Sequence, residues 1–163
     1  MKKRIVSLLL VVFMVATFCS CNGKKADAPE ESATNRALDL QGIKNEMISQ
    51  LDIKDYVDLD EEKLLDQYGI EGEKVKSNGS FIIFSDIFPA EIIMIEAVDR
   101  EAAEEIAEKL EGRLQDLKVQ SRNYDAESYR IAQNCTVLVN ANQVAMFFAQ
   151  QGPQMEDIYH NNF

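Results

Sequence analysis

The sequence predicts an α+β domain: an antiparallel sheet of about four strands in ββαββ order, with a long helix on one face and two helices before it. Apolar residues recur every three to four positions before residue 51 and between residues 99 and 119. Runs rich in β-branched and aromatic residues lie on both sides of the second of these segments. With 163 residues and a net charge of −11, the chain holds one modest domain with an acidic surface, which argues against nucleic-acid binding.

The first 20 residues predict a signal peptide. Lys2, Lys3 and Arg4 precede 14 uncharged residues, 5–18. That length is shorter than the roughly 20 residues that span a hydrocarbon core, and it fits the apolar part of an export signal. A buried N-terminal helix is the alternative, but a helix that is apolar on all sides has no polar face for water.

Residues 18–21 (Phe-Cys-Ser-Cys) resemble a bacterial lipobox, in which a small residue precedes the cysteine that receives diacylglycerol. Ser20 makes Cys21 the acceptor, whereas the bulky Phe18 precedes Cys19. The pattern prefers leucine where this chain has Phe18. We expect a palmitate-bearing anchor on Cys21 that holds the protein on the outer face of the bacterial cell membrane. The alternative is that Cys21 is an ordinary exported thiol.

Residues 21–35 predict a flexible tether, because they are small, polar and charged and include Gly23 and Pro29. Such a segment reaches about 20 Å as a coil and at most about 50 Å when extended. Lys24 and Lys25 either approach anionic lipids or simply aid solubility. Removal of residues 1–20 takes away three positive charges and leaves 143 residues with a net charge of −14. Cys135 is then the one free thiol, so we expect no intramolecular disulfide.

Two helices are expected at the start of the domain, which we place at residues 36–151. The first begins near Thr34 or Asn35, either of which would cap it. Its apolar stripe contains Ala37, Leu40, Ile43, Met47, Ile48 and Leu51. The second covers about residues 60–68, with Asp58 as cap, Glu61 closing a capping box, and Gly69 ending the helix.

Two hairpins and a long helix complete the predicted domain. Residues 77–80 indicate a turn, after which strands at 81–87 and 91–98 form a hairpin. Asp99 caps a helix that extends to about Val119, and a turn with a short helix follows over residues 124–132. Strands at 135–140 and 143–149 pair around residues 140–142. Residues 152–163 lack periodicity, so we expect a mobile C-terminal tail.

Several segments together carry a family resemblance: 64–70, 90–92, 96–99, the Ala/Glu-rich helix to Arg113, Tyr124 to Tyr129, and 137–144. They resemble the lipoproteins of Firmicutes classed as domain of unknown function 4358. Together they cover roughly residues 40–149. Family members commonly have a Gly-Asn-Tyr-Val-like turn where this chain has Ala141-Asn142-Gln143-Val144. The resemblance implies a lipid-anchored domain but no established activity.

The sequence offers few residues for catalysis or metal binding. His160 is the single histidine and lies in the predicted tail, where a general base would lack a fixed position. Cys135 lies in an apolar strand and is expected to be buried. The acidic run 52–62, which includes Asp55 and Asp58, fails as an EF-hand, because Lys63 and Gly69 stand where glycine and glutamate are required. We predict no catalytic, cofactor or metal site, while leaving open whether the run binds a cation.

Alternation along the strands predicts where four further side chains point. Glu91 and Glu96 are five residues apart, so they face opposite sides of the sheet and cannot form a glycosidase pair. One of the adjacent Phe147 and Phe148 must face away from the main core, under the N-terminal helix.

Two functional hypotheses remain. The leading one is a non-enzymatic binding or interaction module of the cell envelope, whose partner is an envelope protein or a cell-wall polymer. The alternative is an accessory or weakly catalytic envelope protein that uses carboxylates on a metal or a cell-surface polymer.

Overall fold

The computed structural model describes residues 38–84 and 89–163, which belong to one compact unit spanning residues 36–163. The predicted signal (1–20), the lipidation site Cys21, the tether (21–35) and the predicted caps Thr34 and Asn35 lie outside the described residues. No helix within the described ranges is both long enough and apolar enough to cross a membrane.

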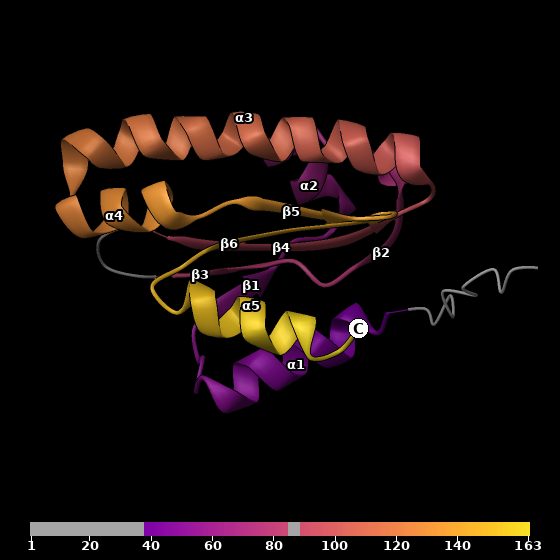
Figure 1. Cartoon of the computed structure of the whole chain (residues 1–163), viewed down its shortest axis with the longest axis horizontal. Helices are drawn as coiled ribbons and strands as arrows, with labels where there is room; N and C mark the ends of the chain where they lie inside the picture. The colour runs from indigo at the N-terminus through magenta and orange to yellow at the C-terminus, as the bar shows by residue number, and fades with distance from the viewer. Residues whose placement is uncertain (1–37, 85–88) are drawn as a thin grey trace, which may run out of the picture. The chain divides into compact units, whose positions relative to one another are not determined.

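The unit is an α+β fold, as predicted, built from helices and one antiparallel sheet (Figure 1). The helices are α1 (Leu40–Gln50), α2 (Glu61–Tyr68), α3 (Arg100–Tyr124), α4 (Ala126–Asn134) and α5 (Gly152–His160), with a 3-10 turn η1 (Gly72–Lys74). The strands are β1 (Tyr56–Asp58), β2 (Val75–Asn78), β3 (Phe81–Ile83), β4 (Ala90–Ala97), β5 (Val137–Asn140) and β6 (Gln143–Phe148).

Within the described residues the sheet has six strands rather than the predicted number of about four. Their order is β1-β3-β4-β6-β5, with β2 also paired to β4. The hairpins β3–β4 and β5–β6 pair as predicted, but β3 ends at Ile83 and β5 begins at Val137. Residues 85–87 of the first predicted strand lie outside the described residues. β2 and β3 keep one register along β4, since Asn78 pairs with Ile95 and Phe81 pairs with Ile92. The predicted turn at 77–80 is therefore an interruption within one strand. β1 was missed because it contains only three residues.

Side chains of β4 and β6 alternate between two apolar clusters on opposite faces of the sheet. Ile93, Ile95, Ala97, Val144, Met146 and Phe148 pack beneath α3, whereas Ile92, Met94, Ala145 and Phe147 pack against α1 and α5. Figure 1 shows α3 on one side of the sheet and α1 and α5 on the other. The prediction that Phe147 and Phe148 face opposite sides is confirmed.

Aspartate side chains cap most of the described helices at their N-termini by accepting hydrogen bonds from backbone N–H groups. Asp39 caps α1, and Asp60, rather than the predicted Asp58, caps α2 through the amide of Lys63 at 3.0 Å. Asp99 caps α3 as predicted, but the helix extends five residues beyond Val119, to Tyr124. Gly69 ends α2 with the expected left-handed conformation (φ 67°).

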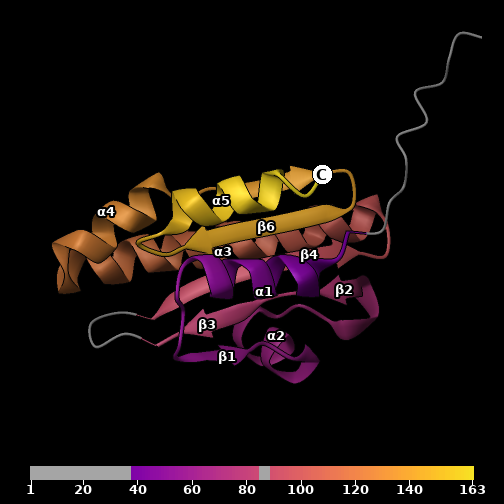
Figure 2. The same ribbon diagram turned by 90° about the horizontal axis from the view of Figure 1, so that it is seen from below.

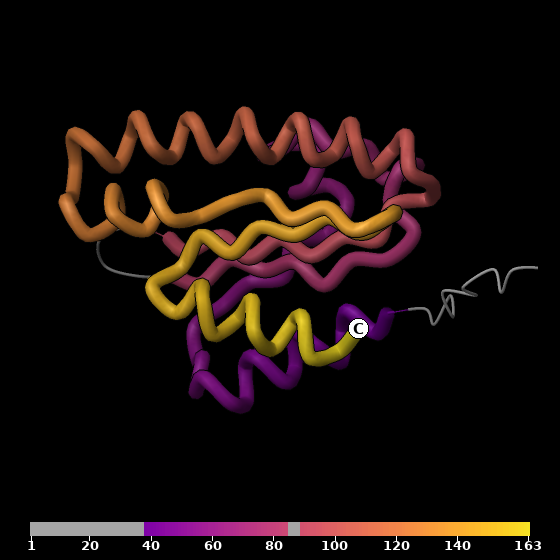
Figure 3. Tube along the Cα trace, in the orientation of Figure 1, coloured from indigo at the N-terminus to yellow at the C-terminus, as the bar shows by residue number. Residues whose placement is uncertain are grey.

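The prediction of a mobile tail at residues 152–163 is wrong, because Gly152–His160 forms α5 and belongs to the domain. Met155, Ile158 and Tyr159 are buried in the cluster beneath α1, and the ring of Tyr159 meets Phe147 edge-on with centroids 5.5 Å apart. Figures 2 and 3 show α1 and α5 side by side on the same face of the sheet. The short helix was overlooked because it carries only three buried apolar positions.

Candidate functional site

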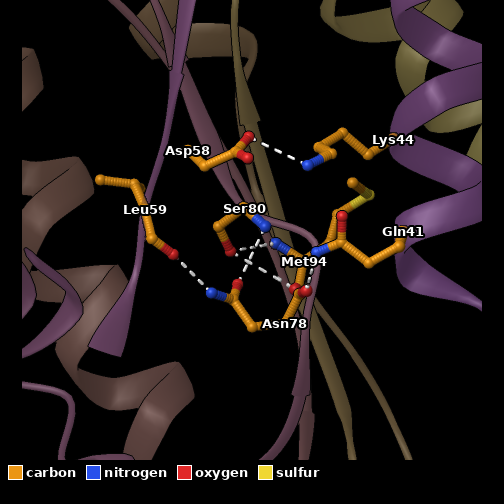
Figure 4. Close-up of polar contacts among 7 residues, drawn as sticks. All are labelled: Gln41, Lys44, Asp58, Leu59, Asn78, Ser80 and Met94. Atoms are coloured by element: carbon orange, nitrogen blue, oxygen red, sulfur yellow. Dashed lines mark hydrogen bonds and ion pairs between the residues drawn. The ribbon is translucent and has the colours of Figure 1, made fainter. Parts of the chain in front are cut away.

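The interruption between β2 and β3 is closed by polar side chains (Figure 4). Gly79 N–H donates to Met94 O at 2.9 Å, but the return bond from Met94 N goes to the hydroxyl oxygen of Ser80, also at 2.9 Å. Asn78 Oδ1 accepts from Ser80 N at 2.8 Å, and Asn78 Nδ2 donates to Leu59 O at 2.5 Å. These side chains replace the missing ladder bonds and join the end of β1 to the interrupted strand.

Helix α1 is fixed onto the same place. Gln41 Nε2 donates to Asn78 O at 2.6 Å (Figure 4). A side chain at Gly79 would place its Cβ 2.5 Å from Leu40 O, so only glycine permits this approach of α1. Lys44 is buried and reaches Asp58 Oδ1 at 3.0 Å, which ties α1 to β1. The junction thus sets the position of β1 at the edge of the sheet.

The acidic run 52–62 is divided among several elements, and only Asp52 and Asp55 line the same hollow among the described residues. Asp52 lies in the loop before β1 and pairs with Lys54 at 3.2 Å, while Asp58 lies on β1. Hydrogen bonds from the side chain and amide of Lys63 hold the pKa of Asp60 below its ordinary value. In the part of the chain that the structure describes, no group of three or more acidic, histidine or cysteine side chains is placed to hold a metal ion.

Glu91 is buried beneath α3 and fully engaged. Tyr68 OH donates to Glu91 Oε2 at 3.0 Å, and Arg113 Nε donates to the same oxygen at 3.0 Å while its Nη2 donates to Oε1. Burial, followed by the charge of Glu91, raises the pKa of Tyr68, and the bonds to Glu91 raise the pKa of Arg113. The cluster joins α2, α3 and β4 across the buried face of the sheet.

Glu96 lies on the opposite face, as predicted, and has partners of its own. Lys76 Nζ donates to Glu96 Oε1 at 2.7 Å, Ser77 Oγ to Oε2 at 3.2 Å, and Asn142 Nδ2 to Oε1 at 3.3 Å. Burial opposes ionisation of this carboxyl, but the bonds from Lys76 and Asn142 prevail and lower its pKa. The two buried glutamates thus belong to separate structural clusters.

Sequence reasoning missed the partners Tyr68, Arg113 and Lys44. A signal existed for Arg113, which falls three residues after Leu110 and four before Leu117, inside the apolar stripe of α3. A charged residue in such a stripe requires a buried partner, and the alternation of β4 turns Glu91 toward that helix. Lys44 likewise falls within the buried stripe of α1.

Cys135 and His160 form no catalytic pair. Cys135 is buried, as expected, but it ends α4 two residues before β5 rather than lying on the strand. Burial raises the pKa of its thiol to about 11. His160 ends α5 with an exposed side chain 3.6 Å from Glu156 Oε1. The hollow beside Cys135 measures about 90 Å³. It is smaller than the roughly 300 Å³ at which pockets for metabolite-sized ligands begin.

The segments from 64–70 to 137–144, which resemble a known family, all lie within the match to a family model. The family model described as Domain of unknown function (DUF4358) matches residues 49–149, which is more than half of the chain. The chain belongs to the DUF4358 family. No match was found among curated proteins or among solved structures.

The DUF4358 match runs from the end of α1 to the residue after β6. It therefore contains the whole sheet, both buried glutamates and the edge strand β1, but not α5. Tyr68, Glu91 and Arg113 come from three separate parts of the DUF4358 region and meet in one buried cluster. The family region thus corresponds to the sheet and the helices on the α3 face.

Proposed function

We propose that this protein is a lipid-anchored lipoprotein on the outer face of the bacterial cell membrane, where its domain serves as a non-enzymatic interaction module. The observation that carries the proposal is Cys21, which follows a small residue at the end of a basic and then apolar leader. Two acyl chains hold a protein at a membrane where one gives only marginal binding, since each buried CH₂ contributes about 0.8 kcal/mol.

The domain supports an interaction role through the state of its buried ionisable groups. Glu91 and Glu96 are held in internal hydrogen bonds, and the thiol of Cys135 is buried with a raised pKa of about 11. A general base must be free to take a proton, and a nucleophilic cysteine needs a lowered pKa. These features support placing the function on the exposed surface, whose acidic character favours contact with a protein or polymer.

The lipid anchor is tested by labelling cells with radioactive palmitate. We expect Cys21→Ala to abolish labelling and to shift the protein out of the membrane fraction, because the acceptor sulfur is gone. The matched control is Cys19→Ala, which lies two residues away and should keep the label. A labelled Cys21→Ala variant, or equal loss of label in both variants, would contradict the anchor.

The interaction role is tested separately by crosslinking the anchored protein in cells and identifying its neighbours by mass spectrometry. We expect the same envelope protein or polymer fragment to be recovered in replicate experiments. A normally lipidated protein that gives no reproducible neighbour would argue against an interaction module while leaving the anchor intact.

A further inference from the structure

We propose that the edge strand β1 binds an extended, positively charged peptide segment of a partner protein, which adds to the sheet as one more antiparallel strand. This inference deepens the proposed function by naming the partner class and the surface. It is carried by backbone groups of β1 that have no partner in the described part of the chain, by the side chains beside them, and by the local charge.

Among residues 38–84 and 89–163, the hydrogen-bond pattern leaves the outer side of β1 unpaired. Leu59 N donates to Ser80 O, and Phe84 N donates to Asp55 O, so the residues that bond to β3 are the odd-numbered ones, 55, 57 and 59. In an antiparallel pair the residues between the bonded ones point their backbone N–H and C=O groups away from the partner strand, here away from β3. The backbone groups of Tyr56 and Asp58 thus face outward and have no partner among residues 38–84 and 89–163.

The side chains next to this edge can make further contacts with an added strand. Tyr56 is 36% exposed, Val57 39% and Phe84 58%. The ring of Tyr56 is held edge-on against Phe81 with centroids 5.8 Å apart, so an aromatic surface is already ordered there. An open hollow of about 330 Å³, lined by Ile53, Ile83 and Phe84 among others, adjoins the start of β1.

Charge selects the kind of peptide. Residues 52–62 carry six carboxylates, Asp52, Asp55, Asp58, Asp60, Glu61 and Glu62. Lys54, Lys44 and Lys63 pair with Asp52, Asp58 and Asp60, which leaves a local excess of three negative charges. Asp58 uses Oδ1 to bind Lys44, while its side chain remains 60% exposed. A lysine or arginine opposite Asp58 would therefore meet a carboxylate that α1 already holds in place. The peptide residue opposite Val57 should be apolar. The bound peptide should therefore alternate basic and apolar residues.

The contacts in Figure 4 fix the edge strand to its neighbours. β1 is held by its ladder to β3, by the bond from Asn78 to Leu59 O, and by the Lys44–Asp58 ion pair. An ordered edge binds an extended peptide mainly through main-chain hydrogen bonds, while neighbouring side chains provide selectivity.

The test uses the full chain in detergent and a five-residue peptide in which lysine alternates with valine, with capped ends. In the antiparallel arrangement the lysines lie opposite Tyr56 and Asp58 and direct their N–H groups at β1. We expect methylation of the backbone nitrogens of the lysines to weaken binding at least tenfold, because it removes those N–H donors. N-methylation of the valines, whose N–H groups face away, should change affinity less than twofold.

The protein side is tested with two variants of equal net charge. Asp58→Asn should weaken peptide binding about fivefold, whereas Asp66→Asn, at an exposed position on α2, should leave it unchanged. In hydrogen exchange, bound peptide should slow the amides of Tyr56 and Asp58 about tenfold and leave that of Val139, on the opposite edge strand β5, unaffected.

Three results would each overturn strand addition in favour of diffuse charge attraction. They are equal weakening by both methylated peptides, equal effects of Asp58→Asn and Asp66→Asn, and unchanged exchange at the amides of Tyr56 and Asp58. These results are independent of palmitate labelling at Cys21 and of in-cell crosslinking, so the inference can fail while the proposed function stands.

Discussion

Gly69 and Ala141 have similar left-handed backbone conformations, with φ of 67° and 53°. Glycine adopts this conformation freely, whereas a side chain there costs about 1–2 kcal/mol. The structure gives this conformation to Ala141 rather than to the flanking Asn140 or Asn142, although asparagine tolerates it better.

Opposite substitutions at these two positions should therefore have opposite effects on stability. We expect Ala141→Gly to raise the free energy of unfolding by about 0.5 kcal/mol, because relief of strain exceeds the added entropy of the unfolded chain. Gly69→Ala should lower the free energy of unfolding by about 1 kcal/mol. No atom lies within 4 Å of the added Cβ, so the loss comes only from the strain of a left-handed backbone at alanine. Urea denaturation measures the free energy of unfolding of both variants. A change in the same direction for both would show that backbone strain does not determine these effects.

Glu96 should make stability depend on pH. Its pKa is lowered in the folded state from an ordinary value of 4.5, so it stabilises the fold above that pH. The contribution is lost as pH falls through the lowered pKa, because protonation then favours the unfolded chain. We expect Glu96→Gln to reduce the free energy of unfolding by about 1.5 kcal/mol at pH 7.

The difference between wild type and Glu96→Gln should shrink progressively below about pH 4.5, as denaturation at several pH values would show. Glu111→Gln, which removes an exposed carboxylate of α3, is the matched control and should follow the wild-type curve. A constant difference at all pH values would indicate lost packing rather than a lost ionic bond.

At the scale of elements, α5 shows how a short segment becomes a helix through its docking. Gly152 lies so close to β6 that an added Cβ would be 2.7 Å from Phe147 O, and Pro153 stands in the first turn, where its missing N–H costs nothing. Nine residues form only a marginal helix in isolation, so contact with Phe147 and α1 stabilises this one.

Removal of the buried side chain of Met155 should therefore weaken the whole domain. We expect Met155→Ala to lower the free energy of unfolding by about 3 kcal/mol, since the residue is fully buried beneath α1. Gln154→Ala, on the exposed side of the same helix, should change it by less than about 0.5 kcal/mol. Equal, small effects in chemical denaturation would mean that α5 is dispensable.

On the scale of the whole molecule, one sheet supports two apolar clusters. β4 and β6 contribute alternate side chains to both, and the helices on the two faces come from distant parts of the sequence: α2, α3 and α4 on one face, α1 and α5 on the other. Each face thus depends on the other, because both are built on the same two central strands.

The sequence by itself determined what periodicity and local chemistry encode. The helical stripe of α3 with its cap Asp99, the two hairpins, and the opposite orientations of Glu91 and Glu96 all follow from side-chain spacing within one segment. The glycine stop at Gly69 follows from a conformation that few other residues adopt. These features need no knowledge of distant contacts.

Tertiary structure alone decided the rest. The three residues of β1 have no alternation of their own and become a strand only by pairing with β3. Arg113 and Tyr68 acquire their roles only when α3 and α2 meet Glu91, 22 and 23 residues away in sequence. Long-range pairing and packing depend on surfaces that the folded chain brings together, so spacing within one segment cannot reveal them.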